Sequence, residues 1–484
     1  MVALIALLPC AAVLITVLVF RLSGVAAAVA AALTALAIWG AGVFTAPTTL
    51  LLGHALHDAV ILDLLVAAII LPGILFVEAS SRRGAPEAIG VVLKSINLNT
   101  PKAAIFIVTG VGVTLESLTG MGVSLLVTVP LLINLVDRRN AIGLALIGMS
   151  LMPWGALSVS AIVGAELANL QLEQLAAMVW RTSGPVAFVL PMLCLAFVPQ
   201  STSRDLGFAA ITGLVLAGGI GLASHGIGIE IAGVAGGLAV VLMSLLFANS
   251  RDGLKEALAA PALRPYAMLI LAVVAQKFLV PPLAAAGIAP AISTDRVTFT
   301  VLSSPGVALL IATLATLAIQ RRQGSPATLL STLLKRSWRP LASILLFMIS
   351  ARLLVESGAI SALAGLLAGL GSYTAVAAVT GLGALSGYVT GSGIIGNALF
   401  MPSAAATGGP FGADAMFAAL QNSAAGHAAM AALPVAAILL TALPSRNIAD
   451  DRTVMSIGLR LSALFTVMLM ISGSMLLVTQ THQP

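Results

Sequence analysis

The sequence predicts an all-α polytopic membrane protein with about 11 to 13 transmembrane helices, because a helix needs roughly 20 apolar residues to cross a bilayer and such runs recur along the chain. Of the 484 residues, 60% are hydrophobic and 8% are charged, whereas about a quarter of the residues are charged in a typical soluble domain. The mean hydropathy is +1.11. This composition excludes an ordinary soluble globule and leaves no soluble domain for separate chemistry.

The net charge of +6 comes largely from Arg and Lys in short connections. In membrane proteins such residues indicate which connections face the cytoplasm, so the charge does not predict a nucleic-acid partner. Cys10 and Cys194 lie in apolar runs without metal-ligand spacing, which is typical of packing residues rather than of a disulfide. We predict no metal and no cofactor; the lipid bilayer is the expected surrounding, and homo-oligomer formation stays open.

The apolar runs predict the spans in chain order. The first run has no basic residue before it and no clear cleavage site after it, so we interpret it as a retained first helix. A stretch with His54, His57 and Asp58 is expected to connect the second and third spans. Besides the interrupted segments described below, the predicted spans cover residues 2–20, 25–44, 59–77, 185–197, 208–222, 229–247, 266–280, 301–319 and 454–478.

Two basic connections organise the chain. Residues 78–102 form a predicted cytoplasmic loop that holds Arg82, Arg83, Lys94 and Lys102. Residues 321–340 carry basic residues and no acid, which is the strongest cytoplasmic signal in the chain. We expect this connection to divide the chain into residues 1–320 and 341–484. Its basic residues are Arg321, Arg322, Lys335, Arg336 and Arg339.

The stretch 387–400 interrupts the apolar pattern most strongly. It reads G-Y-V-T-G-S-G-I-I-G-N-A-L-F, and each glycine weakens a helix by roughly 1 kcal/mol relative to alanine. Non-helical backbone at membrane depth is tolerated only where it is buried in protein or lines a wet cavity. The break therefore predicts a substrate site formed by Thr390, Gly391, Ser392 and Asn397. The alternative is helix packing, because Gly387 and Gly391 form a G-x-x-x-G pair.

A second break is predicted at 116–124, where Thr119, Gly120 and Gly122 repeat the T-G-x-G pattern of residues 390–393. Related breaks in each half are typical of internally repeated transporters with a site between the repeats near the midplane. The sequence thus predicts two related halves with interrupted or re-entrant helices, although glycine-rich membrane sequence also produces such short matches by chance.

Two further interruptions are expected. Pro153 and Gly155 predict a break within 150–157, because proline removes a helix hydrogen bond. Residues 421–427 would be its counterpart in the second half, and they supply Asn422, Ser423 and His427 as candidate site residues.

Several ionisable residues fall inside apolar segments, where each costs roughly 2.5 to 3.5 kcal/mol. Glu116 lies three residues before Thr119, and desolvation there favours a neutral, protonatable carboxyl, which a proton-coupled carrier needs. His427 could serve the same role, although a lone histidine is usually hydrogen-bonded in a core. Arg352 and Glu356 are spaced for a mutual ion pair. The other candidates are Asp63, Glu230 and Lys277, the last with a snorkelling position near a helix end.

The motifs at these breaks resemble those of the lactate permease family, a member of the broader ion transporter superfamily. The family's glutamate and G-F-G segment is similar to Glu116 with residues 120–122, where Met121 replaces the aromatic residue. Its A-F-G-A segment is similar to residues 154–156, and its P-Y-x-x-L helix is echoed by Pro265, Tyr266 and Leu269. Its T-G-S-D segment with N-x-L-F, and its later N-S-x-x-G segment, match the residues Thr390, Gly391, Ser392, Asn397, Leu399, Phe400, Asn422, Ser423 and Gly426.

The sequence departs from the family pattern at three polar positions. The family's aspartate after T-G-S is Gly393 here, its lysine in the late glycine segment is Met430, and a glutamine after the following proline is Val435. If a positive charge is still needed for an anion, Arg352 or helix N-termini must supply it. These departures put lactate itself in doubt.

The resemblance implies a bacterial inner-membrane secondary transporter that moves a small organic anion, such as lactate or glycolate, by proton symport. The alternatives are a carrier of another anion such as a dicarboxylate, with sodium coupling, and a passive anion channel. A membrane-embedded enzyme is disfavoured, since the chain has no H-E-x-x-H and no G-x-S-x-G motif.

Overall fold

The computed structural model describes residues 2–81, 84–120, 122–199, 201–250, 252–319, 326–445 and 447–481. Helices dominate, and the short strands β1 and β2 form one antiparallel hairpin in which Ile292 pairs with Phe299. The first part of the chain contains η1 (Val2–Leu7), α1 (Leu8–Leu14), η2 (Ile15–Val19), α2 (Gly24–Gly40), α3 (Thr49–Ser81), α4 (Ala85–Ile96), α5 (Thr100–Ile105), η3 (Phe106–Gly112), α6 (Val113–Thr119) and α7 (Val123–Ile133).

The middle and last parts continue the helical pattern. The middle contains α8 (Arg138–Met149), η4 (Met152–Trp154), α9 (Gly155–Ala168), α10 (Leu172–Leu195), α11 (Ser203–Gly226), α12 (Ile229–Leu246), α13 (Leu254–Leu258), α14 (Arg264–Ala285), β1 (Ala291–Ser293), β2 (Thr298–Thr300), η5 (Val301–Ser303) and α15 (Pro305–Ile319). The last part contains α16 (Pro326–Glu356), α17 (Ala359–Ala368), α18 (Ser372–Thr390), α19 (Gly393–Gly408), η6 (Gly409–Phe411), α20 (Asp414–Ala429), α21 (Leu433–Ala442) and α22 (Ile448–Thr481).

The predicted all-α polytopic membrane fold is confirmed. Within the described residues, ten helices are long and apolar enough to cross a membrane, and eleven if the bent pair Arg138–Met149 and Met152–Ala168 forms one span. Ten is one fewer than the predicted range of 11 to 13 and eleven is its lower end, because several apolar helices, such as Val123–Ile133, are too short to be counted as spans. Most spans expose apolar side chains on one face, as a protein surrounded by lipid does.

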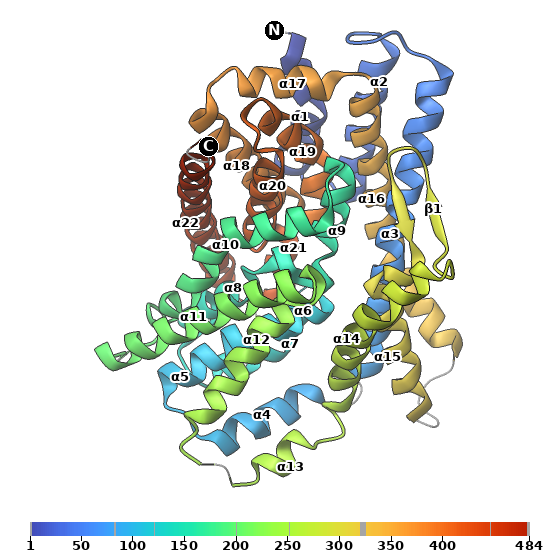
Figure 1. Ribbon diagram of the computed structural model, residues 1–484. Helices are drawn as coiled ribbons and strands as arrows, with labels where there is room; N and C mark the ends of the chain where they lie inside the picture. Colours follow the sequence, from blue (N-terminus) through green and yellow to red (C-terminus); the bar gives the residue numbers. More distant parts are fainter. Residues whose placement is uncertain are drawn as a thin grey trace.

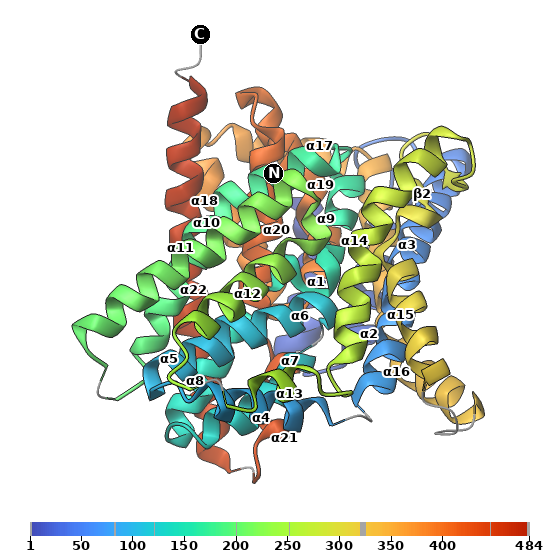
Figure 2. The ribbon, with the colours of Figure 1, turned by 60° about the horizontal axis from the view of Figure 1, so that its bottom comes forward.

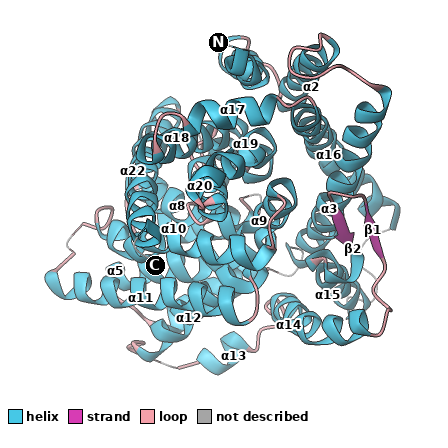
Figure 3. Ribbon diagram, turned by 45° about the horizontal axis from the view of Figure 1, so that its top comes forward, coloured by secondary structure: helices cyan, strands magenta, loops and turns pink. Residues whose placement is uncertain are grey.

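Two groups of helices lie side by side (Figures 1 and 3). In the first, which we call the α16 group, α16 packs against α2 and α3, α15 packs against α3 and α14, and the hairpin covers one end. In the second, the α20 group, α20 packs against α9, α10, α18, α19 and α22, and α12 packs against α9. The two groups touch where α9 meets α3 and where α19 meets α16.

Three stretches predicted as connections contain helix in the structure. α3 begins at Thr49 and includes the stretch of His54, His57 and Asp58. The predicted loop 78–102 contains the end of α3 and then α4, which lies beside α13 at one end of the molecule (Figure 2). α4 forms because its apolar residues recur on one face: Ile89, Val92 and Ile96 are buried.

The third connection is 321–340, where α16 begins at Pro326 and carries Lys335, Arg336 and Arg339. These basic residues lie in the part of α16 that precedes its apolar segment. A cluster of basic residues therefore did not indicate a loop here. Arg82, Arg83, Arg321 and Arg322 lie outside the described residues.

Candidate functional site at the helix breaks

The break at 116–124 is present. α6 ends at Thr119, and α7 begins at Val123 after Gly122 with φ +73°; Met121 lies outside the described residues. Gly120 has φ +65° and ψ −166°, a conformation that only glycine adopts without strain. A Cβ at Gly120 would lie 2.6 Å from the Cβ of Ala156. Gly120 therefore permits both the turn and its close contact with the next break.

Glu116 is buried beside this break. Its Oε2 accepts a hydrogen bond from the Ser124 hydroxyl at 2.7 Å, and its Oε1 accepts one from the Gly122 N–H at 3.2 Å. The Thr119 hydroxyl donates to the Leu115 carbonyl at 2.7 Å and is thus used within its own helix. Glu116 joins the two sides of the break, and among the described residues it makes no salt bridge to a cation.

The predicted break at 150–157 is also present, and it is the most strained. α8 ends at Met149, and the helices on the two sides are bent by 45°. Ala156, Leu157 and Ser158 have φ values of 49°, 54° and 59°, each in the left-handed region that costs an L-residue roughly 1–2 kcal/mol. The Ser158 hydroxyl donates to the Ile229 carbonyl at 2.7 Å. The fold around this turn must hold it in place.

The break at 387–400 is shorter than the sequence indicated. α18 ends at Thr390, Gly391 has φ +67°, and the Ser392 side chain caps α19 by accepting from the Ile395 N–H at 3.4 Å. A Cβ at Gly387 would lie 1.9 Å from the Ala425 carbonyl oxygen. The helix break and close helix packing thus occur together, because Gly391 makes the turn and Gly387 permits the packing.

The fourth predicted interruption, 421–427, is wrong: α20 runs without a break from Asp414 to Ala429. Ser423 and His427 of this helix find partners on neighbouring elements instead of on an opened backbone. The Ser423 hydroxyl bonds to that of Thr182 at 3.0 Å. Both ring nitrogens of His427 have partners, Nδ1 with the Ser150 carbonyl at 2.6 Å and Nε2 with the Ser183 hydroxyl at 2.9 Å.

A polar cluster forms where α9, α19 and α20 meet. The Nδ2 of Asn397 donates to the Ser160 carbonyl and to Oδ1 of Asn422, each at 2.8 Å. Gly164 makes room for this side chain, since a Cβ there would lie 3.1 Å from Asn397 Nδ2. Asn397 and Asn422 are fully buried. Four buried atoms in this region have no partner: Asn397 Oδ1, Asn422 Nδ2, Ser160 Oγ and Gln421 Oε1.

Sequence reasoning identified Asn397 and Asn422 but missed Ser160, Thr182 and Ser183. These hydroxyl residues lie in segments that otherwise read as apolar helix. The sequence did contain an indication for Ser160. This residue follows the predicted break at 150–157, and in a helix it lies on the same face as Gly164, one turn further along α9.

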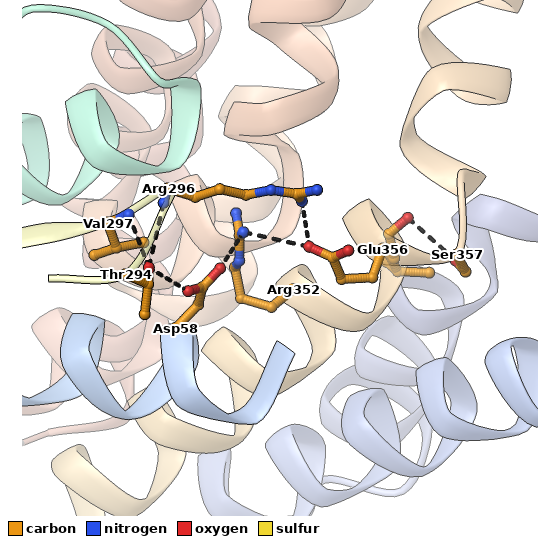
Figure 4. Close-up of polar contacts among 8 residues, drawn as sticks. Asp58, Thr294, Arg296, Val297, Arg352, Glu356 and Ser357 are labelled. Carbon is orange, nitrogen blue, oxygen red and sulfur yellow. Dashed lines mark hydrogen bonds and ion pairs between the residues drawn. The ribbon is translucent and has the colours of Figure 1, made fainter. Parts of the chain in front are cut away.

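Arg352 does not join this cluster (Figure 4). It is buried in an ion pair with Asp58 of α3, and its Nη2 lies 3.6 Å from Glu356 Oε1, as its spacing predicted. Glu356 also pairs with Arg296 of the hairpin. Lys277 likewise has a partner, Glu230 at 2.5 Å, and its predicted snorkelling position stays a prediction.

A cavity of about 650 Å³ lies beside the break at Gly391 and is separate from the polar cluster around Asn397. Thr390 and Ile395 line it near the start of α19, and Arg21 lies at its edge after the first span. Of the described residues that line this cavity, Arg21 alone is charged. The cavity therefore joins a cationic surface residue to the break.

The comparison with protein families decides the family of this chain. The family described as L-lactate permease matches residues 2–277 and 266–478. The chain belongs to the L-lactate permease family. A search of curated proteins finds no match. Membership confirms the resemblance derived from the motifs, and it makes this permease a multi-pass membrane transporter of the lactate type.

The two positions where the resemblance implied an aspartate and a lysine, Gly393 and Met430, carry no charge in this permease. Gly393 faces Ser160, whose Cβ would lie 3.2 Å from a Cβ at Gly393. Met430 is fully buried immediately after α20. The polar cluster is consequently built from amides and hydroxyls.

Proposed function

We propose that this permease carries a short organic monocarboxylate, of the lactate or glycolate type, together with a proton. The observation that carries the proposal is the set of unpartnered buried atoms on Asn397, Asn422 and Ser160. A buried polar atom without a partner costs roughly 1–3 kcal/mol. A ligand that supplies the missing hydrogen bonds explains why such a set is retained.

The chemistry of the cluster fits one carboxylate and one hydroxyl. Asn422 Nδ2 offers a donor for a carboxylate oxygen, and Asn397 Oδ1 offers an acceptor for a hydroxyl. α19 begins at Gly393, one turn before Asn397, and the positive end of a helix dipole favours a carboxylate. Because the cluster is neutral, a single negative charge suits it better than the two of a dicarboxylate.

The cavity of about 650 Å³ supplies a route for the substrate. Arg21 would attract the anion at the edge, and Thr390 and Gly391 would receive it at the break. From there Ser392 and the start of α19 lead toward Asn397 on the opposite side of the helix. The break that contains Thr119, Gly120 and Gly122 touches Ala156. These residues would contribute to the substrate site through that contact.

Glu116 is our candidate for the coupling proton, with His427 as the second. A charged carboxylate in a buried site without a cation is costly, whereas a protonated Glu116 keeps its contact with Ser124. The break beside Glu116 touches Ala156, and α9 continues from there to Ser160. Protonation can therefore act on the substrate cluster through one helix. His427 has both ring nitrogens occupied, which favours a structural role.

The two-half organisation belongs to the same proposal, with residues 1–320 and 341–484 as the halves. A T-G-x-G break in each half supports it. Alternating access would move the α20 group relative to the α16 group, and each group combines helices from both halves. A bacterial inner membrane is the proposed location.

Uptake of labelled lactate and glycolate into proteoliposomes, with and without an inward proton gradient, tests this function. We expect saturable, gradient-stimulated uptake that Asn397→Ala abolishes and that Asn134→Ala, at an exposed asparagine, leaves unchanged. Counterflow from preloaded vesicles distinguishes a carrier from a passive channel. Absence of uptake of either acid would reject the monocarboxylate proposal.

A further inference from the structure

A second cavity, of about 160 Å³, lies between the two groups of helices. α9 and α12 of the α20 group contribute Glu166 and Glu230, while α3 and the start of α15 line the opposite side. Thr298 and Thr300 of β2 border it as well. None of these residues belongs to the substrate cluster proposed above.

Glu230 is the most unusual residue of this cavity. It is 4% exposed, and its Oε1 lies 2.5 Å from the Lys277 ammonium nitrogen. Its Oε2 is buried and has no hydrogen-bond partner. A buried carboxylate oxygen without a partner is costly, and this one belongs to a residue that lines a cavity large enough for a small ligand.

Glu166 provides a second carboxylate. Its Oε2 accepts a hydrogen bond from the Thr298 N–H at 3.0 Å, which fastens the hairpin to the end of α9. The turn of the hairpin, next to Thr298, is held on the α16 group, where Thr294 donates to Asp58 and Arg296 pairs with Glu356 (Figure 4). The hairpin thus closes the cavity while contacting both groups.

The charges of the site leave one negative charge uncompensated. Glu166 and Glu230 carry two negative charges when ionised, and Lys277 supplies one positive charge. Carboxylate and hydroxyl oxygens line the space, and such hard oxygen ligands suit alkali and alkaline-earth cations rather than thiophilic metals. Within the described residues, no three His, Cys, Asp or Glu side chains gather as a transition-metal site would require.

We propose that this cavity binds a hydrated monovalent metal cation between Glu166 and Glu230, with sodium as the probe. The cation contacts the free Oε2 of Glu230 and neutralises the site. It joins α12 and α9 to the hairpin, and thereby the α20 group to the α16 group. Because α9 also carries Ser160, occupancy of the cavity biases the arrangement of the substrate cluster; this last consequence alone rests on the proposed carrier function.

Binding is measured on the purified full-length protein in detergent. Thermal unfolding is followed at constant pH and ionic strength while sodium chloride replaces choline chloride, and equilibrium binding of radioactive sodium is measured in parallel. A ligand that binds only the folded protein raises the melting temperature in a saturable way. We expect this rise for the unmodified protein, and at least about a tenfold loss of sodium affinity in Glu166→Gln.

Two further variants sharpen the test. Glu173→Gln removes an exposed acid near the start of α10 and should keep the sodium response. The double variant Glu230→Gln/Lys277→Met removes both charges of the ion pair, so it leaves no unpaired lysine and should also lose the response. The proposal is overturned if sodium and choline act alike, if only pH moves the melting temperature, or if Glu166→Gln binds sodium normally.

Uptake measured on the same preparation separates this inference from the proposed function. Sodium binding without uptake of lactate or glycolate would reject the proposed function and retain the cation site. Uptake without sodium binding would retain the proposed function and reject the cation site.

Discussion

The Nδ2 amide of Asn397 donates to Oδ1 of Asn422 at 2.8 Å, and this bond joins α19 to α20. The same amide reaches the Ser160 carbonyl of α9 at 2.8 Å. Both N–H groups of Asn397 donate to protein atoms. Within the described residues, Asn397 Oδ1 and Asn422 Nδ2 are buried in the cluster without a partner. This relationship fixes what a substitution at either asparagine should do.

Asn422→Asp should weaken substrate binding while preserving the fold. Aspartate keeps the oxygen that accepts from Asn397, but it loses the free Nδ2 donor and adds a negative charge that repels a carboxylate. A hydrogen bond to a charged group contributes roughly 1.5–3 kcal/mol, so we expect KM for lactate uptake to rise about 10-fold to 100-fold. Asn134→Asp, at an exposed position, is the control, and an unchanged KM in Asn422→Asp would contradict the site.

Glu116→Gln should uncouple transport from the proton. Glutamine retains an oxygen for the Gly122 N–H and remains within reach of Ser124, but it cannot exchange a proton. We expect uptake driven by a proton gradient to be lost, while exchange of labelled for unlabelled substrate continues. Both activities are measured in the same proteoliposomes. Gradient-driven uptake at the normal rate in this variant would remove Glu116 from the coupling role.

Gly120→Ala should destabilise the protein, since the new methyl group would lie 2.6 Å from the Cβ of Ala156 and the backbone has φ +65°. Overpacking costs roughly 1–3 kcal/mol, and the strained backbone adds about 1 kcal/mol or more. Thermal unfolding in detergent measures the loss. Gly53→Ala on α3, where nothing lies within 4 Å, should have little effect.

The double variant Gly120→Ala/Ala156→Gly tests the cause of that loss. Removal of the Ala156 methyl group relieves the contact and also relaxes a left-handed residue. We expect the double variant to unfold at a higher temperature than Gly120→Ala. If it does not, the contact between the two breaks is unimportant for stability.

Arg352→Gln should reduce the amount of folded protein rather than the substrate affinity of what folds. The variant leaves Asp58 buried without its cation, and breaking a buried ion pair costs roughly 3–5 kcal/mol. The double variant Asp58→Asn/Arg352→Gln should recover much of the yield, as measured by size-exclusion chromatography. A higher KM with normal yield in Arg352→Gln would instead support a role as the anion partner.

Local patterns were sufficient to predict the membrane class and most breaks. Apolar runs of span length identify helices in lipid, and glycine or proline at 120, 153 and 391 interrupts a helix through its own backbone. The same reasoning failed at residues 421–427. Asn422, Ser423 and His427 looked like an opened segment, but Asn397, Thr182 and Ser183 from neighbouring helices supply partners for them.

The sequence by itself determined that the chain crosses a membrane, where its helices break and which family it resembles, because hydropathy and backbone propensity act over a few neighbouring residues. Only the tertiary structure decided which polar groups meet. Asp58 and Arg352 are 294 residues apart and form a buried pair, and Ser160 reaches Asn397 across 237 residues. Such partners are chosen by the packing of whole helices, since a buried polar atom must find a partner wherever the fold brings one within reach.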